Sequence, residues 1–112
     1  MVHRDLAVLD AAERLAEQIN ALIDRSPRGR LLHVQQLRDA VQSTVANISE
    51  GFGRRTGRDR ERSLVIARGE AEEGIGHLRA NFRARRIPPD EYWPLHNRLV
   101  VIAKMLTSMV GG

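Results

Sequence analysis

The sequence predicts an all-α protein, an antiparallel up-and-down four-helix bundle that forms a single domain over residues 1–112. Apolar residues recur at helical spacing in four segments, and short stretches containing glycine and proline separate these segments. No segment shows the apolar and polar alternation that is typical of a strand. At 112 residues, the chain is long enough to bury one modest core but too short for two domains.

The first expected helix spans about residues 3–25, and the second spans about residues 31–50. In both, the apolar side chains lie on one side of the helix, as they do in the helices of a bundle. The serine, proline and glycine within residues 26–29 are expected to end the first helix. Gly51 and Gly53 are expected to stop the second, because glycine is common just after helix ends.

The third expected helix runs from Thr56 to about Arg86 and carries two different faces. Thr56, with Asp59 three residues later, is typical of a capping box. One face is a bulky apolar stripe that would join the core. The opposite face is a seam of mostly small residues, which we call the α-seam: Ile66, Gly69, Glu73, Gly76, Ala80 and Ala84.

Two glycines within the α-seam indicate that another backbone approaches this face. Glycine costs about 1 kcal/mol relative to alanine inside a helix, so Gly69 and Gly76 need a reason to be there. The alternative is that both are incidental residues on a solvated face. The fourth expected helix opens at Pro88, accommodates Pro94 near its start and ends at Val110.

The composition excludes several classes of protein. The absence of cysteine excludes a disulfide scaffold, a thiolate metal site and a cysteine nucleophile, so a reducing cytoplasm is the expected location. Charged residues interrupt the first twenty positions, and no stretch approaches the ~20 apolar residues of a membrane span. We therefore expect neither a signal peptide nor a membrane partner.

The charge is basic, with 18 basic against 14 acidic residues and a net charge of +4. All the basic residues except Lys104 are arginines. This bias is typical of phosphate recognition and also of genomic codon preference, and both explanations stay open at this point.

Five arginines gather where the third helix begins: Arg54, Arg55, Arg58, Arg60 and Arg62. Positive charge opposes the dipole at a helix start, and only Asp59 and Glu61 compensate for it there. Backbone phosphates of RNA or DNA would explain the cluster, and a solvated or intersubunit cluster of ion pairs would explain it equally well. Because aromatic residues are few, any such binding is expected to be sequence-nonspecific.

A row of polar residues shares one face of the second expected helix, and we expect these residues to form a structural network. The network contains Arg38, Ser43, Asn47, Glu50 and Glu73, and it would hold a loop turn that contains Gly51, Gly53 and Thr56. Glu50 is expected to pair with Arg38 or Arg54. Glu73, in the α-seam, should have a cationic partner in the same chain or in a neighbouring subunit.

The catalytic alternative would use Glu50 and Glu73 as an acid and base pair or as metal ligands. No histidine stands at ligand spacing from either residue, and the four histidines show no pairing in the sequence. We therefore expect no catalytic residue, no metal and no cofactor, which argues against an enzyme.

Residues 36–67 carry a recognisable motif, reading QLRDAVQSTVANISEGFGRRTGRDRERSLVIA. The stretch resembles the four-helix bundle family named for the 23S ribosomal RNA intervening-sequence proteins. The family pattern falls on Arg38, Ser43, Ala46, Asn47, Ile48, Glu50, Gly51, Phe52, Gly53, Arg54, Arg55 and Thr56. The sequence departs from this pattern at Val45, where the family commonly has proline, and at residues 30–32, which replace a usual Tyr-Gly-Leu. It also has glycine at positions 69, 74 and 76, which are often leucine or serine in the family.

The family also includes the accessory variability determinants of diversity-generating retroelements. These are understood to be basic pentameric barrels that bind nucleic acid and a reverse transcriptase. The resemblance thus implies a homo-oligomer, with a pentamer as the expected form and a reverse transcriptase as a further partner. The sequence as a whole favours a non-enzymatic oligomer that binds RNA or DNA, and the alternative is an oligomeric protein-interaction scaffold that does not touch nucleic acid.

Overall fold

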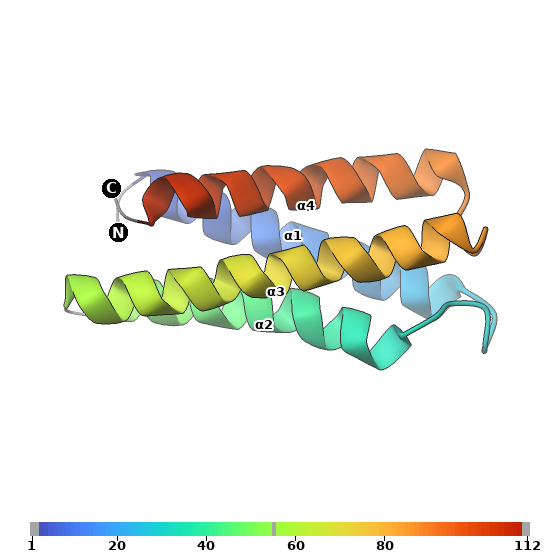
Figure 1. Ribbon diagram of the computed structural model, residues 1–112, viewed down its shortest axis with the longest axis horizontal. Coiled ribbons are helices and arrows are strands. Elements are labelled where there is room, and N and C mark those ends of the chain that lie inside the picture. Colours follow the sequence, from blue (N-terminus) through green and yellow to red (C-terminus); the bar gives the residue numbers. More distant parts are fainter. Residues whose placement is uncertain (1–2, 55, 111–112) are drawn as a thin grey trace.

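The computed structural model describes residues 3–54 and 56–110, which form four helices joined by short loops (Figure 1). The helices are α1 (His3–Arg25), α2 (Val34–Gly53), α3 (Gly57–Arg83) and α4 (Pro89–Met109). The described residues contain no strand, so the predicted all-α class is confirmed. Each helix packs beside the next one in the chain, and α4 packs back against α1, as in an up-and-down bundle.

The bundle is an elongated body of 44 × 21 × 18 Å. In Figure 1, the end where α2 meets α3 projects past the beginning of α1 and the end of α4. The start of α3 lies at this projecting end (Figure 1). None of the described helices is apolar over a length sufficient to cross a membrane.

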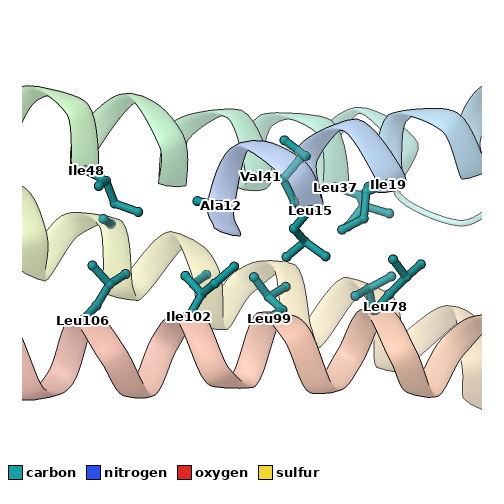
Figure 2. Packing of buried hydrophobic residues seen from close by; sticks show 14 of the residues in the cluster. Ala12, Leu15, Ile19, Leu37, Val41, Ile48, Leu78, Leu99, Ile102 and Leu106 are labelled. Atoms are coloured by element: carbon teal, nitrogen blue, oxygen red, sulfur yellow. The ribbon is translucent and has the colours of Figure 1, made fainter. Parts of the chain in front are cut away.

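The core runs along the axis of the bundle and takes side chains from all four helices. Figure 2 shows apolar side chains from facing helices meeting there, among them Leu15 of α1, Leu37 of α2, Leu78 of α3 and Leu99 of α4. Each of these four leucines is at most 2% exposed. Burying a leucine side chain contributes about 2 kcal/mol, so these rows account for the assembly of the amphipathic segments into one body.

α2 begins at Val34, three residues later than expected, because contacts with α3 hold the preceding segment in a loop. Leu31 is buried, and the side chain of Asn81 on α3 binds the backbone of Leu32. His33 then adopts a left-handed conformation with a φ of 54°. Apolar periodicity alone could not separate these residues from the helix.

α2 also ends later than expected, because it continues through Gly51 to Gly53. Gly51 is buried where the last turn of α2 meets the first turns of α3. A Cβ at this position would lie 3.2 Å from Cδ2 of Leu64 and 3.3 Å from Cβ of Ser63. The glycine therefore allows the two helices to approach closely, rather than stopping α2.

α3 ends at Arg83, three residues before the expected end. The backbone amide of Arg86 donates to the backbone carbonyl of Asn81 at 2.8 Å, and the backbone amide of Arg85 donates to the backbone carbonyl of Phe82 at 3.0 Å. These two bonds are those of a Schellman motif, in which the residue after the helix cap is left-handed. Arg85 takes that position with a φ of 61°, although glycine is the usual residue there.

Candidate nucleic-acid interface

The candidate site lies at the projecting end of the bundle, where α2 passes into α3. Thr56 is the N-cap of α3, and its hydroxyl accepts a hydrogen bond from the amide of Asp59 at 3.2 Å. The N-cap half of the predicted capping box is therefore present. This cap and the close contact at Gly51 fix the first turns of α3 against the last turns of α2.

The polar row on α2 is held by local hydrogen bonds. The side-chain nitrogen of Asn47 donates to the backbone carbonyl of Ser43 at 2.8 Å and to the hydroxyl of Ser43 at 3.2 Å. Glu50 forms an ion pair with Arg54, the C-cap residue of α2. These contacts orient Asn47 and Glu50 along one edge of α2, facing the start of α3.

A polar cavity of about 290 Å³ opens between these two helix ends. From α2 and its cap it is lined by Asn47, Glu50 and Arg54, and from α3 by Asp59, Arg62, Ser63 and Ile66. Ser63 is only 8% exposed. Within the described ranges, neither its hydroxyl nor the side-chain oxygen of Asn47 takes part in a hydrogen bond, and neither of these two oxygens is fully buried. The cavity thus holds polar groups with unused hydrogen-bonding capacity.

Arg60 differs from the other arginines of the cluster because it has a structural contact inside the bundle. Its Nη2 lies 3.2 Å from Oδ1 of Asp5 on α1, and Asp5 is only 4% exposed. The guanidinium also lies 5.0 Å from the centre of the Phe52 ring. Arg60 therefore neutralises a buried carboxylate and is less available to an external phosphate than a free arginine would be.

Three of the remaining arginines are exposed at the projecting end. Arg58 and Arg62 lie one turn apart on α3 and form no ion pair with any residue that the structure describes. Arg54 is half exposed and paired with Glu50. Arg55, which the sequence also singled out, lies outside the described residues.

Two members of the expected polar network lie away from this end. Arg38 donates from Nη1 to the side-chain oxygen of Asn20 at 2.7 Å and from Nη2 to Asp24 at 2.6 Å, so it joins α2 to α1 rather than reaching Glu50. Glu73 is exposed on α3, and no ion pair to it is found among residues 3–54 and 56–110. Helical spacing places residues on a face but does not show which neighbouring helix that face meets.

The α-seam is open in the single chain. Nothing lies within 4 Å of the position where a Cβ would stand at Gly69 or Gly76, and Ile66 is 43% exposed. The close approach within the chain occurs instead at Gly74, where a Cβ would lie 2.9 Å from Cδ2 of Leu99. Any backbone that needs Gly69 and Gly76 would therefore have to come from another molecule.

The structure also brings together two histidines that the sequence left unpaired. The Nδ1 atoms of His33 and His77 lie 3.3 Å apart, because the loop before α2 folds against α3. Only this tertiary contact reveals the pair. No cluster of three or more metal-ligating side chains occurs in the described part of the chain.

The chain is similar to proteins of one family. The sequence profile described as 23S rRNA-intervening sequence protein matches residues 4–108. A crystal structure of a protein with unknown function from the S23 ribosomal protein family of Bacteroides thetaiotaomicron is 25% identical, with a TM-score of 0.90. That match covers 97% of this chain and 99% of the other. No curated protein matches the sequence significantly.

Proposed function

The chain belongs to the 23S rRNA-intervening sequence protein family, and on this premise we propose that it is a non-enzymatic, homo-oligomeric protein that binds nucleic acid through phosphates. The proposed contact residues are Arg54, Arg58 and Arg62 at the projecting end, together with Arg55 from the sequence pattern. The observation that carries the proposal is the exposure of Arg58 and Arg62 at the N-terminal end of α3, without an ion pair among the described residues.

The position of these arginines supports an anionic partner for a physical reason. The first amides of a helix carry partial positive charge, so two further cations in the first turns cost stability unless an anion offsets them. Arg58 and Arg62 are four residues apart, and such residues lie on the same side of a helix. One strand of phosphates could contact both, and it would also meet the free amides at the start of α3.

Self-association would strengthen this interaction. The open α-seam, with Gly69 and Gly76 unobstructed, is a surface on which another copy could pack its backbone closely. A ring of copies would repeat the projecting end and raise the local potential well above that of one chain with a charge of +4. By the family resemblance, we extend the proposal to a pentamer that serves a reverse transcriptase.

The second candidate is an oligomeric scaffold that binds protein and not nucleic acid. The observation that favours it is the exposure of apolar side chains at the α-seam, where Ile66 of the seam is 43% exposed and its neighbour Val65 is 38% exposed. A scaffold would assemble through these side chains, with little dependence on salt. It would leave the arginines as a solvated surface.

Fluorescence anisotropy with labelled RNA and DNA, measured across a range of salt concentrations, tests the proposal. The variant Arg54→Ala/Arg58→Ala/Arg62→Ala should bind more weakly, and the slope of log affinity against log salt should fall by about 2. The matched control is Arg28→Ala/Arg79→Ala/Arg83→Ala, which removes three exposed arginines from the other end of the bundle.

The control should retain most of the wild-type slope and affinity. Equal losses in both triple variants would indicate a response to net charge alone and would reject this end as the interface. No binding by the wild type at low salt would leave the scaffold as the better function. Light scattering of the same samples gives the number of subunits.

A further inference from the structure

The interior of the cavity between Asn47 and Ser63 differs from the outer surface, where Arg54 and Arg62 are proposed to contact phosphates. Among the described lining residues, two arginines, Arg54 and Arg62, are matched by two carboxylates, Glu50 and Asp59, so these residues together have a formal charge of zero. A phosphate would gain little net attraction inside it and would be repelled by both carboxylates. The occupant that fits is a neutral group that both donates and accepts hydrogen bonds.

The cavity wall offers such a group complementary partners. Asn47 and Asp59 provide acceptor oxygens, Arg62 provides donors, and the Ser63 hydroxyl can serve as either. Ile66 adds an apolar surface that is 43% exposed. A nucleobase has these properties, because it is a flat ring with both donors and acceptors along its pairing edge. That edge is free only in a single strand.

Ser63 gives the cavity a polar contact that does not depend on the arginines. The residue as a whole is 8% exposed and lines the cavity, and its hydroxyl forms no hydrogen bond within the described ranges. No buried side-chain oxygen among the described residues lacks a partner, so this hydroxyl opens onto the cavity, where a ligand could replace water as its partner. The side-chain nitrogen of Asn47 donates hydrogen bonds to Ser43. These bonds fix the orientation of the Asn47 side chain and leave its oxygen open to a donor.

We propose that this cavity takes one unpaired nucleobase from a single strand, while the exposed guanidinium of Arg58 binds the adjoining phosphate. The inference rests on the proposed function and adds a preference for single-stranded over duplex nucleic acid. The volume of about 290 Å³ is near the lower limit of ordinary small-ligand pockets, which suits one base and not a stacked pair.

The test compares a labelled single-stranded RNA with the same RNA annealed to its complement, both measured at one salt concentration. Wild type should prefer the single strand, and Asn47→Ala/Ser63→Ala should reduce single-strand affinity by about tenfold, as expected for two lost hydrogen bonds. The salt slope should not change, since no cation is removed. The matched control is Gln42→Ala/Ser49→Ala, which removes an amide and a hydroxyl from exposed positions of α2 outside the cavity.

A second measurement follows the Asn47 side-chain amide by NMR while guanosine monophosphate is added to the wild type. A saturable shift at this amide, absent on the control residue Gln42, is the expected result. Circular dichroism of each variant checks that the bundle is folded.

The outcomes separate the inference from the proposed function. Salt-dependent binding with equal affinity for single strand and duplex, unaffected by Asn47→Ala/Ser63→Ala, overturns the base cavity and leaves phosphate binding intact. Loss of affinity in the control variant as large as in the cavity variant also overturns it. A wild type that binds neither RNA nor DNA at low salt removes the proposed function itself.

Discussion

Arg60 of α3 and Asp5 of α1 form an ion pair that joins the start of the first helix to the start of the third. The Nη2 to Oδ1 distance is 3.2 Å, and the Asp5 side chain is only 6% exposed. The pair lies beside the projecting end, so it also holds the exposed arginines of α3 in place. Among the arginines at the start of α3, Arg60 thus has a structural role, while Arg58 and Arg62 face solvent.

Arg60→Ala should lower the free energy of unfolding by about 2 kcal/mol, because it leaves the carboxylate of Asp5 buried without a partner. Urea denaturation followed by circular dichroism measures the change. Arg58→Ala is the control and should shift the free energy by less than about 0.5 kcal/mol. If the two variants are equally stable, the ion pair does not contribute to the fold.

Asn81→Ala should cost about 3 kcal/mol, since Asn81 is fully buried and makes three hydrogen bonds. Its side-chain oxygen accepts from the amide of Leu32 at 2.7 Å, and its nitrogen donates to the carbonyls of Leu32 and His77 at 3.0 and 2.9 Å. Amide hydrogen exchange should show faster exchange at Leu32. Asn97→Ala, at an exposed position of α4, is the matched control and should have little effect.

The glycines of α3 should respond in opposite directions to alanine. Gly74→Ala should destabilise the chain, because its Cβ would lie 2.9 Å from Cδ2 of Leu99. A Cβ added at Gly69 or Gly76 would have no atom within 4 Å. Gly69→Ala and Gly76→Ala should therefore each stabilise an isolated chain by up to about 1 kcal/mol.

The same two seam variants test assembly. If another copy packs against the α-seam, each added methyl group should weaken the oligomer, which light scattering over a dilution series would detect. An oligomer unchanged by Gly69→Ala and Gly76→Ala would place the contact between copies elsewhere.

Glu70 should make stability depend on pH in an unusual direction for a carboxylate. Burial raises the pKa of Glu70 above its ordinary value of 4.5, and the nearby charges of Glu73 and Asp39 raise it further. The unfolded chain therefore releases this proton at lower pH than the folded chain, so this group's contribution to stability falls as pH rises from 4.5 through the raised pKa.

Glu70→Gln should accordingly raise the melting temperature at neutral pH, and the gain should disappear in acid below the ordinary pKa. Thermal unfolding across that range is the measurement. Glu72→Gln, at an exposed position of the same helix, controls for the removal of one negative charge. A gain that persists at low pH would point to a cause other than the ionisation of Glu70.

The helical spacing of apolar residues was sufficient to predict the number of helices, their order and the all-α class. The first and last helices match their expected bounds closely, and Thr56 caps α3 as its spacing with Asp59 indicated. These features depend on local backbone chemistry and on which residues share a helix face. Both are determined by residues that are close together in the sequence.

The polar contacts were harder to predict, because predicting each one requires knowing which helices face each other. Arg38 meets Asn20 and Asp24 instead of Glu50, and Arg60 leaves the basic surface for Asp5. Gly74, and not Gly69 or Gly76, is the glycine of α3 against which another helix of the chain packs. His33 and His77, far apart in sequence, meet only through the loop before α2.

The sequence by itself determined a basic four-helix chain with arginines gathered at the start of its third helix, because periodicity, caps and charge are local properties. Only the tertiary structure decided which arginines remain free, where α2 begins and ends, and that Asn47 and Ser63 line one cavity. These depend on the rotation and depth at which the helices pack, which are set by side chains that meet across the bundle and not by their spacing along the chain.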